Sequence, residues 1–324
     1  MAEITYREAI SGVLREYLEK DDRVFLMGED IGAYGGSYAV TRGFLERYGE
    51  ERIKDAPIAE AVITGAGIGA ALGGLRPVLE LMTINFSLLA MDQIVNHAAK
   101  LRYMSGGQFS IPLVIRTVSG GGNRLGAQHS QSLEGWFAHV PGLKVAVPST
   151  PYDARGLFRA AMEDNNPVLF VEHSLLYNVK GDVPEGYYEV PLGQAAVGPE
   201  GTGITIVSYS RMAHLCRQVA GKLAGEGISC EVVDLRCLRP LDMEPVLQSV
   251  MKTHRAVLVE ETWATGGFMA EVASQITAQA FDYLDAPVAR VAGKEVPMPY
   301  SRPLELAALP DEEEVTRAIR QVLA

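Results

Sequence analysis

Residues 55–74 read DAPIAEAVITGAGIGAALGG, a stretch in which one acid, Glu60, precedes a helical segment with almost no side chains. Glycines at positions 65, 69 and 73 recur every four residues and would form a bare stripe along that helix. Each interior glycine costs roughly 0.5–1 kcal/mol relative to alanine, so the stripe indicates close approach of another backbone or a ligand. Glu60 is therefore either an acid that stabilises the helix N-terminus or a proton carrier at an interface.

Strand and helix patterns alternate on both sides of this stretch, and Thr5 and Glu8 are spaced as a capping box. The expected strands are 23–27, 77–84, 112–117, 143–147, 168–172, 204–208, 230–235, 256–259 and 288–291. Helices are expected from 60, at about 87–104, near 130–139, from 151 to 164, and near 211–226, 243–251, 268–281 and 312–323. This alternation predicts an α/β fold with mainly parallel sheets. The periodicity fades between 174 and 198, so we divide the chain into domains 1–190 and 191–324.

The composition of the 324 residues is that of an ordinary globular protein, with 48% apolar and 21% charged residues. The net charge of −11 argues against nucleic acid or an anionic membrane as a partner. The N-terminus lacks the apolar core of a signal peptide, and no apolar run reaches the ~20 residues of a spanning helix. Cys216, Cys230 and Cys237 lack metal-like spacing and indicate reduced thiols. We therefore expect a soluble intracellular protein.

Ligands of open α/β sheets bind beyond the carboxyl ends of the strands. The segments expected there in the first domain are 28–30, 55–60, 85–86 and 119–129. They supply a carboxylate at Glu60, a phenyl ring at Phe86 and an imidazole at His129. A carboxylate can share a proton with a ring nitrogen, a phenyl ring can stack, and an imidazole can serve acid–base steps. The set suits a heteroaromatic cofactor.

Neighbouring residues leave alternatives open. Glu29 is either a solvated acid in a strand-end turn or a charge that favours a proton on Glu60. His129 follows three glycines in a loop that is costly to order unless it closes on a ligand. Arg124 in that loop could meet an anionic substrate or be a solvated charge. The run Asp164-Asn-Asn-Pro167 is typical of a helix stop, although its carbonyls could bind a hard cation.

Several cofactor and catalytic motifs are absent. The chain has no GxGxxG that opens a strand–helix unit with a distal acid, no GxxxxGK[ST], no HExxH and no GxSxG. The sequence thus supplies groups for a heterocycle and no recognisable cradle for a diphosphate.

Eight segments, spread over nearly the whole chain, together carry a resemblance to a known family. They are MGEDIGAYGGSY (27–38), DAPIAE (55–60), DQIVNHAAKLRYMSGG (92–107), GAQHSQS (126–132), PGLKVAVPSTPYDARGL (141–157), DNNPVLFVEH (164–173), LDAP (284–287) and VPMPY (296–300). In their order and spacing the chain resembles the beta subunits of thiamine-diphosphate-dependent 2-oxoacid dehydrogenase decarboxylating components, most closely the pyruvate dehydrogenase type. The resemblance implies a pyrimidine-binding transketolase-like domain followed by a transketolase C-terminal-like domain.

The resemblance also implies roles for the site residues. Glu60 looks like the acid that hydrogen-bonds the aminopyrimidine ring nitrogen and so promotes loss of the proton from the thiazolium carbon, with Glu29 as its hydrogen-bonded neighbour. Phe86 resembles the aromatic residue that packs on the pyrimidine, which Ile58 and Met82 also line. His129 resembles the imidazole that faces the substrate and the lipoyl group.

Partners follow from the same resemblance. The chain lacks the GDG…NN pattern that holds magnesium and the diphosphate, and in the two-subunit enzymes that pattern lies on the alpha subunit. We therefore expect an α2β2 heterotetramer that shares thiamine diphosphate, with magnesium on the alpha subunit. Asp285 and the terminal carboxylate of Ala324 are expected to dock the dihydrolipoyl acyltransferase core. By the same comparison, carbonyls of Leu113, Ala161, Met162, Asp164 and Asn166 would hold a potassium ion. One departure is Leu88-Leu89, where animal pyruvate enzymes commonly have a polar residue.

The implied activity is oxidative decarboxylation of pyruvate with transfer of acetyl to lipoamide, in a bacterial cytoplasm or an organelle matrix or stroma. A branched-chain 2-oxoacid or acetoin enzyme of the same architecture is the nearest alternative. A non-catalytic assembly subunit is an alternative of another class, which the presence of Glu60 and His129 disfavours. The missing diphosphate motif excludes a free-standing transketolase-like enzyme.

Overall fold

The computed structural model describes residues 1–324 and divides them into two compact units. Unit 1 comprises Met1–Ser119 and Trp136–Leu192, and unit 2 comprises Gly120–Gly135 and Gly193–Ala324. After Leu192 the rest of the chain belongs to unit 2, whereas our division lies after residue 190. The earlier excursion of residues 120–135 into unit 2 was not predicted, because the sequence around it shows no break in the strand–helix alternation.

Unit 1 is built on a parallel sheet in the order β6, β7, β5, β4, β2, β3, with a separate antiparallel pair formed by β1 and β8. Its strands are β1 (Ala2–Thr5), β2 (Val24–Gly28), β3 (Ile53–Asp55), β4 (Arg76–Leu81), β5 (Val114–Ser119), β6 (Lys144–Ala146), β7 (Val168–His173) and β8 (Lys180–Val183). Its helices are α1 (Tyr6–Lys20), α2 (Phe44–Tyr48), α3 (Glu60–Leu72), α4 (Leu101–Met104) and α6 (Pro151–Glu163), and α5 (Glu134–Ala138) joins the two units. Short 3-10 turns η1 (Phe86–Ala90) and η3 (Ser174–Leu176) and a π-helical segment η2 (Gln93–Ala98) complete it.

Local sequence signals explain two of these helices. The predicted capping box is confirmed, because Thr5 accepts a hydrogen bond from the backbone of Glu8 and the Glu8 side chain accepts one from the backbone of Thr5. The Thr150 hydroxyl caps α6 by accepting the backbone N–H of Asp153 at 3.1 Å, and Pro151 lies in the first turn of this helix. The two helices pack against each other, and α1 buries an apolar face made of Ile10, Val13, Leu14, Tyr17 and Leu18.

Two predicted helices of unit 1 are shorter or broken. The segment expected as one helix at 87–104 consists of η1, η2 and α4. The Ser87 hydroxyl donates to the Ile84 carbonyl and closes a tighter turn where the helix was expected to start. Of the helix expected near 130–139, only Glu134–Ala138 forms. The residues before it belong to a loop whose contacts lie in unit 2. Those contacts, and not the 3.6-residue sequence pattern, determine the backbone conformation there.

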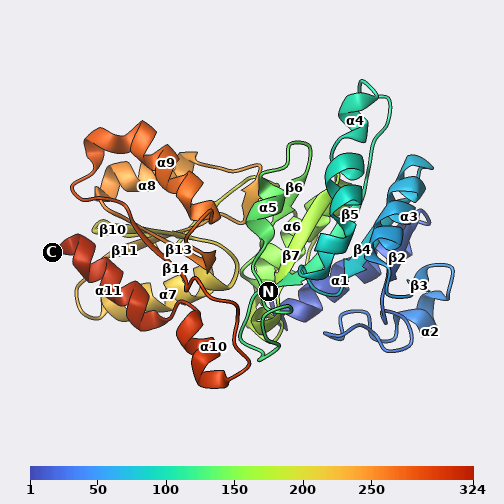
Figure 1. The fold of residues 1–324 in the computed structure, drawn as a ribbon, viewed down its shortest axis with the longest axis horizontal. Coiled ribbons are helices and arrows are strands. Elements are labelled where there is room, and N and C mark those ends of the chain that lie inside the picture. The colour runs from blue at the N-terminus through green and yellow to red at the C-terminus, as the bar shows by residue number, and fades with distance from the viewer. The chain divides into compact units, whose positions relative to one another are not determined.

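Unit 2 contains a sheet in the order β14, β13, β10, β11, β9, parallel except for the short edge strand β9. The strands of this sheet are β9 (Ala196–Val197), β10 (Ile204–Ser208), β11 (Cys230–Asp234), β13 (Ala256–Trp263) and β14 (Ala289–Gly293), and the short strand β12 (Cys237–Arg239) is not part of it. The helices of unit 2 are α7 (Ser210–Ala224), α8 (Glu244–Thr253), α9 (Phe268–Ala280), α10 (Arg302–Ala308) and α11 (Glu312–Leu323), with a 3-10 turn η4 (Phe281–Tyr283). Helices α8 and α9 cover one face of this sheet and α7 and α11 the other (Figure 1).

The two units confirm the predicted α/β class with mainly parallel sheets. The core of unit 2 lies between the sheet and α7 and α11, and includes Ile206, Val219, Val232, Val257 and Ile319. All three cysteines are buried and none forms a disulfide. Neither unit has a helix with the length and apolar character needed to span a lipid bilayer.

Candidate cofactor site

Glu60 is the first residue of α3 and is only 3% exposed. The residue before it, Ala59, provides no side-chain cap, so an acid at this end does favour the helix dipole. An acid that served the dipole alone would keep its carboxylate in water, since burial of a charge is costly. Stabilisation of the helix therefore does not by itself explain Glu60.

Glu29 is the buried neighbour of Glu60. It follows the last residue of β2 and is 7% exposed. Its pKa is raised first by burial, then by the charge of Glu60 and by a hydrogen bond to that residue. One carboxyl oxygen of Glu29, Oε1, is buried without a hydrogen-bond partner in the chain. The pair is thus placed to share a proton and has an acceptor to spare.

The loop after β2 is tied down, which fixes Glu29. The Asp55 carboxylate accepts the backbone N–H of Gly32 at 2.6 Å and that of Ala33 at 3.2 Å. The Thr41 hydroxyl, fully buried, donates to the Ile31 carbonyl at 2.7 Å. Because Asp55 ends β3, the neighbour of β2, the sheet itself sets the path of this loop.

The predicted apolar residues follow β4. Met82 comes directly after this strand, Phe86 opens η1, and both are half-buried. Since β2 and β4 are neighbouring parallel strands, Glu29 and Met82 leave the sheet at the same edge. Ile58 is 82% exposed, so it can line a pocket only when another surface covers it. The structure therefore places Glu29, Glu60, Met82 and Phe86 at the predicted edge of one sheet.

His129 and Arg124 lie in unit 2, on the excursion of residues 120–135. Both are exposed, and the His129 backbone N–H donates to the Gly126 carbonyl at 3.3 Å. The backbone N–H of Arg124 is bound by the buried carboxylate of Glu305. The loop is therefore anchored within unit 2, whereas Glu60 belongs to unit 1.

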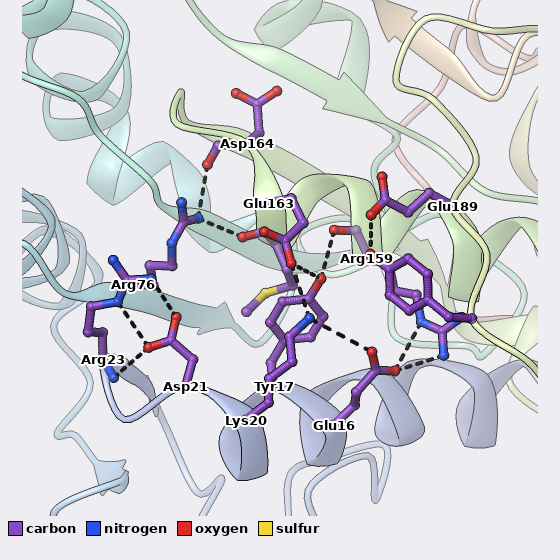
Figure 2. Close-up of polar contacts among 12 residues, drawn as sticks. Glu16, Tyr17, Lys20, Asp21, Arg23, Arg76, Arg159, Glu163, Asp164 and Glu189 are labelled. Carbon is purple, nitrogen blue, oxygen red and sulfur yellow. Dashed lines mark hydrogen bonds and ion pairs between the residues drawn. The ribbon is translucent and has the colours of Figure 1, made fainter.

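Two of the five carbonyls expected to hold potassium already accept hydrogen bonds from a cation of the chain (Figure 2). The Arg76 guanidinium donates to the carbonyl of Met162 at 2.6 Å and to that of Asp164 at 3.3 Å. The Leu113 carbonyl accepts the backbone N–H of Val168 at 2.9 Å. Carbonyl oxygens have a second lone pair, so these residues fit a potassium ion only if it shares two oxygens with the guanidinium. No group of three or more His, Cys, Asp or Glu side chains is placed to hold a metal ion.

Unit 1 also contains a buried ion network that was not predicted from the sequence. Arg116 on β5 bonds the Glu172 carboxylate at 2.7 and 3.0 Å and Glu80 at 2.6 Å, and the Tyr177 hydroxyl donates to Glu172 at 2.7 Å. Burial lowers the pKa of Arg116, but the two carboxylates outweigh it and raise that pKa. Charged residues inside three apolar strand patterns were the signal that could have revealed this network.

The predicted docking residues lie in unit 2. Asp285 forms an ion pair with Arg255 at 3.4 Å and remains half-exposed. It lines a groove of about 900 Å³ whose other lining residues are small or apolar and include Phe281 and Pro287. Ala324 is exposed and follows α11 at the end of the chain.

Two domain families and several known proteins match this chain. The transketolase pyrimidine-binding domain matches residues 2–180 and the transketolase C-terminal domain matches residues 193–315. The chain is 47% identical over 323 residues to the pyruvate dehydrogenase E1 component subunit beta-2, mitochondrial, of Oryza sativa subsp. japonica, covering 98% of this chain and 86% of that protein. It is 46% identical over 320 residues to the pyruvate dehydrogenase E1 component subunit beta of Rickettsia felis, covering 99% and 98%.

Solved structures show the same fold at lower identity. A structure titled "Split gene transketolase, inactive beta4 tetramer" superposes with a TM-score of 0.81 at 23% identity, covering 99% of this chain and 98% of that one. A transketolase from Campylobacter jejuni gives a TM-score of 0.73 at 13% identity, covering 98% of this chain and 47% of its own. At these identities the likeness concerns the fold alone.

Proposed function

Because the chain belongs to the family of pyruvate dehydrogenase E1 component beta subunits, we propose that it catalyses oxidative decarboxylation of pyruvate together with an alpha subunit. The acetyl unit is transferred to lipoamide of the acyltransferase core. The observation that carries this proposal is the buried Glu29–Glu60 pair at the edge of the unit 1 sheet. A subunit used only for assembly would have no need for two acids buried against each other.

Thiamine diphosphate is the cofactor that this pair would serve. The buried Glu29 oxygen without a partner, the half-buried Phe86 ring and the half-buried Met82 thioether fit a polar heterocycle. Glu60 would hold a proton facing a ring nitrogen, Glu29 would stabilise that shared proton, and Phe86, Met82 and Ile58 would contact the ring. When bound, the cofactor supplies a nucleophilic carbon and a sink for the electrons left by decarboxylation.

His129 is the acid–base group that we propose for the substrate and lipoyl side of the reaction. It is exposed at the end of an anchored loop, which suits a group that must reach an incoming acyl acceptor. Arg124, in the same loop and also exposed, is available to an anionic substrate.

The alpha subunit would hold the diphosphate and magnesium, since this chain lacks a motif for either. The surface of unit 1 supports a partner near the cofactor site. Gly69 on α3 has nothing within 4 Å of where a side chain would be, and Leu88 and Leu89 on η1 are 40% and 66% exposed. An α2β2 heterotetramer that covers this surface would also cover Ile58.

The acyltransferase core would dock on unit 2. Asp285 offers a half-exposed carboxylate beside a shallow apolar groove, and the exposed residue Ala324 follows α11. The Asp285 carboxylate suits a basic partner surface. We assign the whole assembly to a bacterial cytoplasm or to an organelle matrix or stroma.

Potassium is proposed on the carbonyls of residues 113, 161, 162, 164 and 166, in competition with Arg76. Arg76→Met would free two oxygens and remove a repelling charge, so the variant should gain more thermal stability from KCl than the unaltered chain does, relative to NaCl at equal ionic strength. Arg76→Lys, which keeps a charge, is the matched control. A midpoint independent of the cation in both proteins would argue against a potassium site.

Substrate assays of the reconstituted heterotetramer test the proposed function. With pyruvate, 3-methyl-2-oxobutanoate and acetoin compared at equal concentrations, we expect the highest kcat/KM for pyruvate. A preference for 3-methyl-2-oxobutanoate or acetoin would favour the branched-chain or acetoin alternative. No turnover of any of them by a correctly assembled tetramer would favour an assembly subunit.

A further inference from the structure

The loop that carries His129 is clamped in unit 2 by two buried carboxylates from distant parts of the chain. Glu305, on α10, accepts the backbone N–H of Gly122 at 3.0 Å and that of Arg124 at 2.7 Å through the same oxygen, Oε1. Glu261, on β13, accepts the backbone N–H of Gly121 at 2.8 Å. Glu305 is fully buried and Glu261 is 8% exposed.

The backbone of the loop is shaped to receive these carboxylates. Gly122 and Arg124 both have left-handed φ values, 104° and 57°. Backbone turns of this kind direct nearby N–H groups toward one point and form anion-binding nests. In this loop the anion is a side chain of the protein itself.

Cations balance the two acids, so the clamp is stable when buried. Arg302 donates to Oε2 of Glu305 at 3.3 Å and also to the Gly122 carbonyl, which ties the loop to α10 twice. Arg211 donates to the second oxygen of Glu261 at 3.1 Å. Charge-assisted hydrogen bonds of this type are roughly twice as strong as neutral ones.

The clamp also determines the path of the arm that bears His129. The backbone N–H of Gly120 donates to the Gln131 carbonyl at 3.2 Å and closes the base of the loop. Gly126 has φ +78°, and a side chain there would meet the Tyr300 ring at 2.5 Å. His129 therefore lies in a short segment between Arg124, which Glu305 holds, and Gln131, which closes the base of the loop.

We propose that Glu305, assisted by Glu261, is a positioning residue for His129. It fixes the loop before the substrate arrives, so that little conformational entropy is lost when the imidazole engages. The inference rests on the acid–base role proposed for His129, and two independent readouts separate the two claims.

Hydrogen exchange tests the clamp without reference to activity. In the heterotetramer, Glu305→Ala should raise the exchange rate of amides in residues 120–131 at least about tenfold, since it removes the acceptor of two of them. Glu305→Gln keeps an oxygen for both amides but presents an NH2 group to Arg302, so its effect should be intermediate. Glu231→Gln is the matched control, because Glu231 also accepts a backbone N–H, that of Gly201, and pairs with a lysine. Unchanged exchange in Glu305→Ala would overturn the clamp, even if activity fell.

A double-mutant cycle tests whether Glu305 acts through His129. Glu305→Gln should lower kcat for acetyl transfer to lipoamide by roughly 5- to 100-fold with little change in KM, because a small misplacement of a reacting group is costly. In a His129→Ala background the same substitution should change kcat less than about twofold. Equal losses in both backgrounds would overturn the positioning role. If His129→Ala itself retained full activity, the role proposed for His129 would be wrong. The hydrogen-exchange result would still show whether Glu305 holds the loop in place.

Discussion

At the scale of single residues, the proposed chemistry depends on two acids that are buried against each other. Glu29 and Glu60 come from the ends of different elements, and loop contacts to Asp55 and Thr41 hold the first of them in place. Burial and the charge of Glu60 raise the pKa of Glu29, so its carboxyl group binds a proton more tightly than an isolated glutamate does. A proton held there could be offered to a ring nitrogen.

Glu29→Gln should change how stability depends on pH. Folding raises the pKa of Glu29, so the folded state binds this proton more tightly than the unfolded chain does. Above the folded pKa the ionised side chain lowers stability, and this cost disappears as the pH falls through that pKa toward the ordinary value of about 4.3. The glutamine variant should therefore have the higher thermal midpoint at about pH 8, by a margin that shrinks on acidification. Parallel curves for variant and unaltered protein would contradict this, and Glu50→Gln, at an exposed position, is the control.

At the scale of elements, helix α3 has glycines on two faces with different surroundings. Gly67 is buried against β4, and a side chain there would meet Leu79 at 2.6 Å. Gly69 faces outward with free space around it. The first glycine serves the packing of this chain, and the second leaves a surface for another one.

Alanine at the two positions should have opposite effects. Gly69→Ala should stabilise the isolated chain by roughly 0.5–1 kcal/mol through helix propensity and weaken its assembly with the alpha subunit. Gly67→Ala should destabilise the chain, because the Leu79 side chain or the helix must move. Denaturant unfolding and analytical ultracentrifugation with the partner measure the two quantities. Unimpaired assembly of Gly69→Ala, and of a bulkier Gly69→Leu, would contradict an interface on this face.

The sequence predicted the bounds of those elements whose own residues determine their structure. The strand 204–208 and the helix 312–323 were predicted with the bounds that the structure has, because their apolar periods are regular. The helix expected at 87–104 is broken by local bonds such as that of Ser87 to Ile84, which no periodicity reveals. Glu60 and His129 were candidates from their own segments, and their proposed roles came from the family resemblance. Glu305 could not be singled out from its segment, since its partner Gly122 is 183 residues away in the chain.

At the scale of the whole molecule, we propose that the chain carries one half of a cofactor site. Unit 1 supplies the acids and apolar side chains suited to a heterocycle, and neither unit has a sequence motif for a diphosphate. A charged diphosphate needs donors or a metal ion to leave water. We therefore expect the other half to come from a second polypeptide.

The isolated chain should be inactive and bind thiamine diphosphate more weakly than micromolar, because the interactions of the diphosphate are missing. Isothermal titration of the purified chain, with and without magnesium, measures this. Addition of the alpha subunit should increase the affinity sharply and make it dependent on magnesium. Micromolar binding by the chain alone would show that it has a diphosphate site of its own.

The most direct test of the account is the turnover of pyruvate by the heterotetramer with Glu60→Gln. A glutamine of the same size should preserve the fold and assembly but removes the acid that shares a proton with the cofactor ring. The account predicts a fall in kcat of about 100-fold or more, in the range of a lost general acid–base group. A Glu60→Gln tetramer that turned over pyruvate as fast as the unaltered enzyme would contradict it.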